Sequence, residues 1–280
     1  MLLAAGTAGY ARELAGTVDL AALGGVISKA VSREPRRGNL PPRVTEFRGG
    51  MLNSVGLANP GLDAALAVDL PAMLAVCGET RVLVNVVGFV EEEYVRVVEG
   101  VSRMSGVAAL ELNLSCPNTA SGGLEFGADL DAVRRIVAGC VQVARLPILA
   151  KLSPATPHLP ALAVAAMEAG AAGVSLVNTM PGWIGGPRGA PRLGNGFGGV
   201  SGPALLPVGL AAVRRVRERL GPDGVIMGCG GVRSAGDVRA YLAAGADLVA
   251  IGTGALASPR LPEQIVRTLA REGLQEMGHG

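Results

Sequence analysis

The sequence predicts an α/β fold, a (β/α)8 TIM barrel that forms a single domain over residues 1–280 with its active site at the C-terminal ends of the strands. Three observations predict it. Eight short apolar runs occur, amphipathic stretches separate them, and the length is close to the roughly 250 residues of such a barrel. The runs do not alternate with polar residues, which is typical of parallel strands buried on both faces. A doubly wound sheet would usually contain fewer strands.

The predicted strands are spread over the whole chain. They are Leu2–Ala5, Gly25–Ser28, Arg81–Val87, Ala108–Leu114, Ile148–Leu152, Gly173–Asn178, Val225–Gly228 and Leu248–Ile251. Between them, apolar residues recur at the helical period, and this predicts helices that include Leu130–Ala144, Leu205–Leu220 and Ala235–Ala244. Two segments rich in glycine and proline, Val31–Pro60 and Met180–Gly202, break the regular spacing after strand ends. We expect them to be long functional loops.

Composition excludes several classes of function. A net charge of +2 gives no reason to expect binding to nucleic acid or to an anionic membrane. The basic run Arg33–Arg43 is either an electropositive loop or an ordinary solvated one. The first ten residues have no basic stretch and are too short to span a membrane, so they predict a first strand and turn and not a signal peptide.

The four cysteines are Cys77, Cys116, Cys140 and Cys229. They are widely spaced and form no CxxC pair, so we expect neither a metal site nor a disulfide framework. This usage predicts a cytoplasmic protein. Cys77 and Cys140 fall on apolar helical faces and are expected in the core, and packing is also the favoured role of Cys229.

Polar residues follow the predicted strands at their ends. The run Glu111–Asn118 (ELNLSCPN) is the most informative, because an apolar pattern ends there in two amides, a hydroxyl and a thiol. Similar positions are Ser28, Lys29, Asn53, Asn85, Lys151, Asn178 and Thr179. Each alone would be a turn former or a solvated side chain. Together, in a barrel, they predict one polar mouth.

The last two strands end in glycines instead. Gly228-Cys229-Gly230-Gly231 and Gly252-Thr253-Gly254 offer bare backbone amides where barrels often hold phosphate. A phosphorylated ligand is therefore expected, with Lys29 and Lys151 near its other end. FMN is a good candidate, because a fixed cation stabilises the negative charge of the reduced ring. The chain has no P-loop and no dinucleotide fingerprint.

The order of these motifs resembles the class 1 dihydroorotate dehydrogenase catalytic subunits over nearly the whole chain. The matching stretches are SKAVSREPRRGN, GMLNSVGLANPG, ELNLSCPNT, AKLSP, LVNT, GGVSGPA, GCGGV and IGTG. The basic loop and the GG.EFG continuation after SCPN are most similar to the NAD-linked subclass 1B. The resemblance implies an FMN barrel that oxidises dihydroorotate to orotate in pyrimidine (UMP) biosynthesis.

The resemblance also implies a role for each motif. Cys116 would be the base that removes the C5 proton while hydride passes from C6 to flavin N5, with Ser115 beside it as a candidate relay. The implied substrate-binding residues are Lys29, Asn53, Ser54, Val55, Gly56, Leu57, Asn113, Asn118, Asn178 and Thr179. The implied cofactor-binding residues are Ala5, Gly6, Lys29, Ala30, Asn85, Asn113, Lys151, Val177, Gly202, Gly230, Gly231, Gly252 and Thr253.

The chain departs from the family pattern at its first strand. That strand begins almost at Met1, whereas the family usually has residues ahead of it, and Ala4-Ala5-Gly6 lacks the hydroxyl of the usual ASG. Subclass 1B would add a separate FAD and [2Fe–2S] subunit, and the family suggests a homodimer core. Two other functions stay open: a related FMN barrel that acts on another dihydropyrimidine, and a flavin-free phosphate-binding barrel enzyme.

Overall fold

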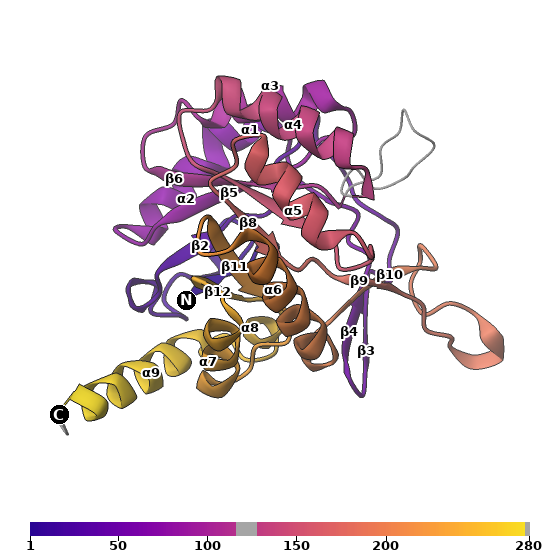
Figure 1. The fold of residues 1–280 in the computed structure, drawn as a ribbon. Coiled ribbons are helices and arrows are strands. Elements are labelled where there is room, and N and C mark those ends of the chain that lie inside the picture. The colour runs from indigo at the N-terminus through magenta and orange to yellow at the C-terminus, as the bar shows by residue number, and fades with distance from the viewer. Residues whose placement is uncertain (116–127, 278–280) are drawn as a thin grey trace.

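The computed structural model describes residues 1–115 and 128–277 and contains a closed parallel barrel (Figure 1). Its strands, in the order in which they pair, are β1 (Leu2–Leu3), β12 (Leu248–Ile251), β11 (Val225–Cys229), β8 (Gly173–Leu176), β7 (Ile148–Leu152), β6 (Val107–Asn113), β5 (Val82–Val86) and β2 (Gly25–Ile27), which returns to β1. All eight predicted strands are confirmed, with small differences at their ends.

The strands are apolar because both of their faces are buried. Every residue of β5 and of β7 is buried. One apolar cluster fills the space between the barrel and its helices, and a smaller one, which includes Leu2, Ile27 and Met227, lies apart from it. Burial of this kind favours the folded state by roughly 25 cal/mol per Å² of apolar surface.

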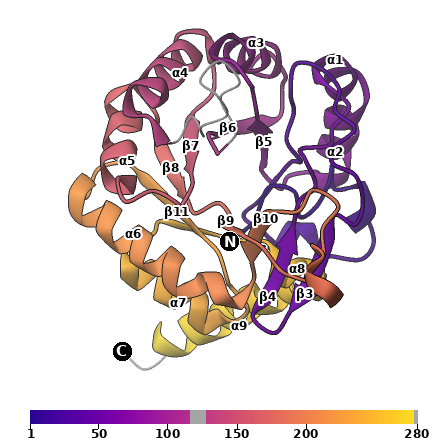
Figure 2. The ribbon, with the colours of Figure 1, turned by 90° about the vertical axis from the view of Figure 1, so that its right-hand side faces the viewer.

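Helices surround the barrel, as the view onto its mouth shows (Figure 2). They are α1 (Leu62–Ala64), which continues through a π-helical turn (Ala65–Asp69) into α2 (Leu70–Cys77), then α3 (Glu91–Val101), α4 (Leu130–Val143), α5 (Leu159–Glu168), α6 (Leu206–Leu220), α7 (Ala235–Ala244), α8 (Thr253–Ala257) and α9 (Leu261–Met277). Short 3-10 helices span Arg12–Leu14, Leu20–Ala22, Pro187–Gly189 and Pro203–Leu205. The three predicted helices are confirmed to within one residue at each end.

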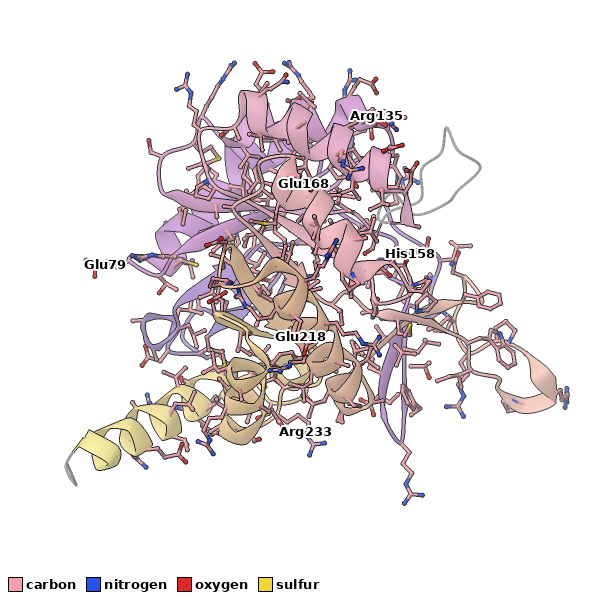
Figure 3. All side chains as sticks on the ribbon, viewed as in Figure 1. Glu79, Arg135, His158, Glu168, Glu218 and Arg233 are labelled. Atoms are coloured by element: carbon pink, nitrogen blue, oxygen red, sulfur yellow. The ribbon has the colours of Figure 1, made fainter. Side chains whose placement is uncertain are left out.

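The helices point their charged side chains away from the barrel. Arg135, Glu168 and Glu218 extend outward from α4, α5 and α6 (Figure 3). Side-chain caps start two of the helices: Asp129 accepts hydrogen bonds from two amides of α4, and Ser234 accepts one from Asp237 in α7. In the part of the chain that the structure describes, no helix combines the length and the apolar character needed to cross a membrane.

A second sheet corrects our expectation of two long loops. It contains β3 (Val44–Phe47), β4 (Gly50–Asn53), β10 (Gly198–Ser201) and β9 (Met180–Gly182), and all of its adjacent strands run antiparallel. Two of these strands follow barrel strand β2 and two follow β8, so the sheet is attached at the C-terminal ends of the barrel strands (Figure 2). Gly199 pairs with Asn53, a partner far away in the sequence that local patterns do not reveal.

Tyr241 connects the helical layer to the end of a barrel strand. Its ring is fully buried in α7, and its hydroxyl donates to the carbonyl of Gly230 at 2.8 Å. Gly209 in α6 makes room for that hydroxyl, because an added Cβ would overlap it. The Tyr241 hydroxyl thus holds the backbone after β11, and it can do so because Gly209 in α6 has no side chain.

We expect Gly209→Ala to lower the free energy of unfolding by about 1–3 kcal/mol, because the new methyl group must displace the Tyr241 hydroxyl. Urea denaturation monitored by circular dichroism measures this change. The matched control is Gly273→Ala in α9, where no heavy atom lies within 4 Å of the added Cβ. There the better helix propensity of alanine should leave stability equal or raise it by up to ~1 kcal/mol. An equal gain at both positions would contradict the packing role of Gly209.

Candidate active site

A polar layer lies inside the barrel, next to the C-terminal ends of its strands. On three neighbouring strands an apolar residue is followed two positions later by a polar one: Leu83 by Asn85, Ala109 by Glu111, and Leu149 by Lys151. Since side chains two residues apart share a face, the polar groups continue the inward face begun by the apolar cluster around Leu83 and Leu149. The barrel interior therefore changes from apolar to polar toward the mouth.

Glu111 joins this layer together. Its Oε1 accepts a hydrogen bond from Asn85 Nδ2 at 2.7 Å and lies 3.4 Å from Lys151 Nζ. Sequence reasoning gave Glu111 no role, although it lies two residues before Asn113 and so on the same face of β6. That spacing is the signal that could have identified it.

The charge of Lys151 depends on this carboxylate. Burial is the largest influence and disfavours the ammonium form, but the attraction of Glu111, the neighbouring Cys229 and the hydrogen bond to Glu111 together outweigh it, so the pKa of Lys151 is raised above its ordinary value. Lys151 is therefore a permanent cation at neutral pH. Burial also raises the pKa of the Cys229 thiol, and Lys151 offsets this only in part. Cys229 is accordingly a neutral thiol packed in the barrel interior, and Cys77 and Cys140 are free and buried in α2 and α4.

Two amides meet at the ends of β6 and β8. Asn178 Nδ2 donates to Asn113 Oδ1 at 3.1 Å, and Asn178 Oδ1 accepts from the amide of Thr179 at 2.8 Å. The backbone carbonyl of Asn113 is held by the Tyr94 hydroxyl at 2.7 Å. These hydrogen bonds fix the ends of both strands and hold the neutral side-chain amides of Asn113 and Asn178 in defined positions.

The second sheet contributes the predicted substrate loop, residues 54–57. Asn53 ends β4 and donates to the Gly199 carbonyl at 3.2 Å, and Asn39 donates to Ser54 Oγ at 2.7 Å. Gly56 and Leu57 both have positive φ, at 73° and 57°. Among the described residues, no backbone acceptor is found for the amides of Gly56 and Leu57. Sequence reasoning did not identify Asn39, whose contact with Ser54 requires the folded loop.

Backbone amides are available at the ends of β11 and β12. Within the described ranges, the N–H groups of Gly230, Gly231 and Gly252 donate to no backbone carbonyl. Gly231 has φ of 74°, and a Cβ there would lie 2.6 Å from Leu206. Beside them, Thr253 Oγ1 donates to Ser201 Oγ at 2.8 Å. These amides and hydroxyls form a cradle that suits a phosphate.

The remaining predicted positions are more dispersed. Lys29 is half-buried, and its ammonium has no partner in the part of the chain that is described. Ala5 is half-buried and Gly6 exposed after β1, Ala30 packs with Val87, and the amide of Val177 donates to Cys229. Gly202 approaches the second sheet closely, because a Cβ there would lie 2.9 Å from Gly50 Cα. Cys116 and Asn118 lie outside the described residues.

The charged groups around one surface cavity are paired with one another. A surface cavity of about 370 Å³ is lined by Asp19, Arg260, Glu263 and Arg267. Glu263 accepts from the Asp19 amide and from Arg260, and Arg267 pairs with Asp19, so these charged groups already have partners. Within residues 1–115 and 128–277, no cluster of three or more His, Cys, Asp or Glu is placed to hold a metal ion.

Comparison with known proteins gives one consistent family. The family model described as "Dihydroorotate dehydrogenase" matches residues 1–272. A Latilactobacillus sakei protein described as "Dihydroorotate dehydrogenase B (NAD(+)), catalytic subunit" is 42% identical over 270 residues, which are 96% of this chain and 87% of that protein. A Listeria monocytogenes protein of the same description is 40% identical over 276 residues, 98% of this chain and 89% of the relative.

A third relative has a different electron acceptor in its description. This Solibacter usitatus protein is described as a candidate dihydroorotate dehydrogenase A (fumarate). It is 42% identical over 281 residues, which cover 99% of this chain and 91% of the relative's length. Overall identity thus does not separate the two acceptor types, but all three relatives and the family model agree on the enzyme. The chain belongs to the dihydroorotate dehydrogenase family.

Proposed function

We propose that this chain oxidises dihydroorotate to orotate in pyrimidine biosynthesis, with residues 1–280 acting as one FMN-binding domain. One observation carries the proposal: an amide cradle at the ends of β11 and β12 shares the barrel mouth with a buried cation, Lys151, on β7. FMN needs these two features at opposite ends, an anion site for its phosphate and a positive charge near its ring.

The residues present fit FMN chemically. Gly230, Gly231, Gly252 and Thr253 would hold the phosphate, and Lys151 and Asn85 would hold the pyrimidine edge of the ring. One buried polar atom, Ser175 Oγ, has no partner among the described residues, as expected near a polar ligand site. The other proposed FMN positions are Ala5, Gly6, Lys29, Ala30, Asn113, Val177 and Gly202. When bound, FMN supplies the acceptor for the hydride that leaves the substrate.

The substrate ring is planar at its imide edge and carries one carboxylate. Neutral amides suit the imide, because they pair with it without changing its charge. We assign this role to Asn53, Asn113, Asn118, Asn178 and Thr179. The amides of Gly56 and Leu57, which have no backbone acceptor in the described part of the chain, are assigned to the carboxylate together with Lys29. Ser54 and Val55 shape this loop, which Asn39 holds in place.

Cys116 is our proposed base. It follows the end of β6 directly after Asn113–Ser115 and would remove the proton from C5 while the C6 hydrogen leaves with its electron pair, so that the C5–C6 double bond forms. A free cysteine has a pKa of about 8.5, so the site must favour the thiolate or relay its proton. The Ser115 hydroxyl is a candidate relay, since it is buried and has no partner among the described residues.

A second subunit is proposed as the route for electrons. Two of the relatives are described as NAD(+)-linked catalytic subunits. We therefore propose that a partner carrying FAD and a [2Fe–2S] cluster passes electrons from this chain to NAD. The described residues offer no cysteine set for such a cluster, which would belong to the partner.

We also propose a homodimer core that forms in the cytoplasm. The two chain segments that contain the strands of the second sheet, residues 31–60 and 180–202, expose large apolar side chains in or beside those strands. They are Leu40 (78%), Phe197 (68%), Trp183 (48%) and Val44 (48%). The segments touch, because the Gly194 amide donates to the Pro42 carbonyl at 2.9 Å. Exposed apolar groups of this size mark association surfaces. Free Cys77, Cys140 and Cys229 suit a reducing compartment.

The purified protein should bind FMN and convert dihydroorotate to orotate with an artificial electron acceptor. Flavin absorbance should bleach on addition of dihydroorotate, and orotate is quantified by chromatography. NAD reduction should require the added FAD and [2Fe–2S] subunit. Dihydrouracil, which lacks the carboxylate, is the matched control substrate and should be inert. Bleaching by dihydrouracil alone would overturn the substrate assignment.

Replacement of the proposed base should separate binding from chemistry. We expect Cys116→Ala to retain FMN but to lose about 10²–10⁴-fold in kcat near pH 7, because no group then takes the C5 proton. Stopped-flow flavin reduction measures this rate. Cys77→Ala in α2 is the control and should keep the wild-type rate. Unchanged reduction in Cys116→Ala would remove Cys116 from the base role.

A side chain in the amide cradle should weaken cofactor binding. In Gly231→Ala the new Cβ would lie 2.6 Å from Leu206, so the cradle must shift. We expect the Kd for FMN, measured by quenching of flavin fluorescence, to rise about tenfold or more. The control is Gly236→Ala, where the nearest atom, Ser234 Oγ, lies 3.5 Å from the added Cβ. Equal Kd values for the two variants would count against a phosphate at Gly231.

A further inference from the structure

Glu111 is a buried charge that neither the proton transfer nor the proposed ligand contacts use. Its side chain is fully buried, whereas the side chain of Lys151 keeps 8% of its surface exposed. A ligand in the mouth can therefore reach Lys151 but not Glu111. Whatever Glu111 does for the reaction must act through the residues that it touches.

Fold stability does not account for this carboxylate. A buried ion pair is on average no more stabilising than apolar side chains of the same volume, because both ions lose their hydration. The contact with Lys151 is 3.4 Å long, and Glu111 Oε2 has no partner among the described residues. A pair optimised for stability would be shorter and would have its remaining oxygen satisfied.

The contacts of Glu111 instead restrict the position of the Lys151 ammonium group. Glu111 Oε1 is shared between Lys151 Nζ and Asn85 Nδ2, and these two groups come from β7 and β5, on either side of β6. One carboxylate oxygen thus links side chains from three adjacent strands. Lys151 Nζ makes no other hydrogen bond to the described residues, so its two remaining N–H donors are available to a ligand.

We propose that Glu111 is a positioning residue, whose carboxylate, shared with Asn85, holds the Lys151 ammonium in place and directs it toward the flavin ring. The inference rests on FMN as the cofactor of the proposed function. Cys229 is the other titratable group that acts on Lys151, and its own pKa is raised by burial, so it is a neutral thiol near pH 7. Without the Glu111 carboxylate, burial of Lys151 is therefore the dominant influence, and a buried lysine can lose its proton at or below neutral pH. The cation near the ring would then be present only at low pH.

The test is the pH dependence of FMN affinity, measured by fluorescence quenching from about pH 5 to about pH 9.5, because buried lysines can have pKa values as low as about 5–6. Glu111→Gln is nearly isosteric and can still accept from Asn85. Its Kd should approach the wild-type value at the acid end, where Lys151 is charged. As pH rises through the lowered pKa of Lys151, the ratio of mutant to wild-type Kd should grow about tenfold or more, since a charge-assisted hydrogen bond is lost.

Two control variants separate this role from simple loss of packing. Glu111→Asp keeps the negative charge, so its Kd ratio to wild type should not vary with pH. Glu111→Gln/Lys151→Met lacks the titrating group and should show the weak alkaline affinity at every pH. A Kd ratio for Glu111→Gln that is constant over the whole range, or equal to one, would overturn the proposal.

A measurement without FMN distinguishes failure of this inference from failure of the proposed function. In apo Glu111→Gln the folded-state pKa of Lys151 lies below its unfolded value, so the unfolded chain binds more protons and stability should rise with pH relative to the double variant. If wild-type protein binds no FMN but this rise occurs, the cofactor assignment falls and the Glu111–Lys151 link stands. If FMN binds and the rise is absent, the link is wrong and the cofactor assignment stands.

Discussion

Closure of the barrel depends on its shortest strand. In β1, Leu2 and Leu3 pair with Ala250 and Ile251 of β12 on one side and with Gly25 and Val26 of β2 on the other. A parallel sheet with unpaired edges would leave backbone donors and acceptors unsatisfied, so these few pairings complete the hydrogen-bonding ring. Because β2 leads into Lys29 and β12 into Gly252, the same pairings bring the two ends of the proposed cofactor site onto one rim.

The site is built from residues that the barrel forces together and not from a local motif. Asn85, Glu111 and Lys151 come from three adjacent strands, and each occupies an inward position next to the mouth. The helical layer supports the same rim at the end of β11, where Gly209 leaves room for the Tyr241 hydroxyl and that hydroxyl donates to the Gly230 carbonyl. The position of the backbone at the amide cradle therefore depends on how α6 and α7 pack against each other.

The sequence predicted the barrel well because its strands are buried on both faces, so their apolar runs are continuous and easily recognised. The second sheet could not be predicted in this way. Its strands are short, and Asn53 pairs with Gly199, which lies 146 residues further along the chain, so no local period marks these strands. Asn85 and Lys151 were recognisable as polar strand ends. Glu111 was missed: its spacing from Asn113 indicates the inward face, but only the register of β6 between β5 and β7 shows that its carboxylate meets both Asn85 and Lys151.

The second sheet also connects two regions that the sequence presents as separate. Ser201 in β10 accepts from Thr253 at the proposed phosphate cradle and pairs with Met51, while Gly199 in the same strand pairs with Asn53 beside the proposed substrate loop. Thr253 and Asn53 are thus connected through one pair of strands, β4 and β10. Any coupling of the two proposed subsites through these strands would be reciprocal: the factor by which cofactor strengthens substrate binding would equal the factor by which substrate strengthens cofactor binding.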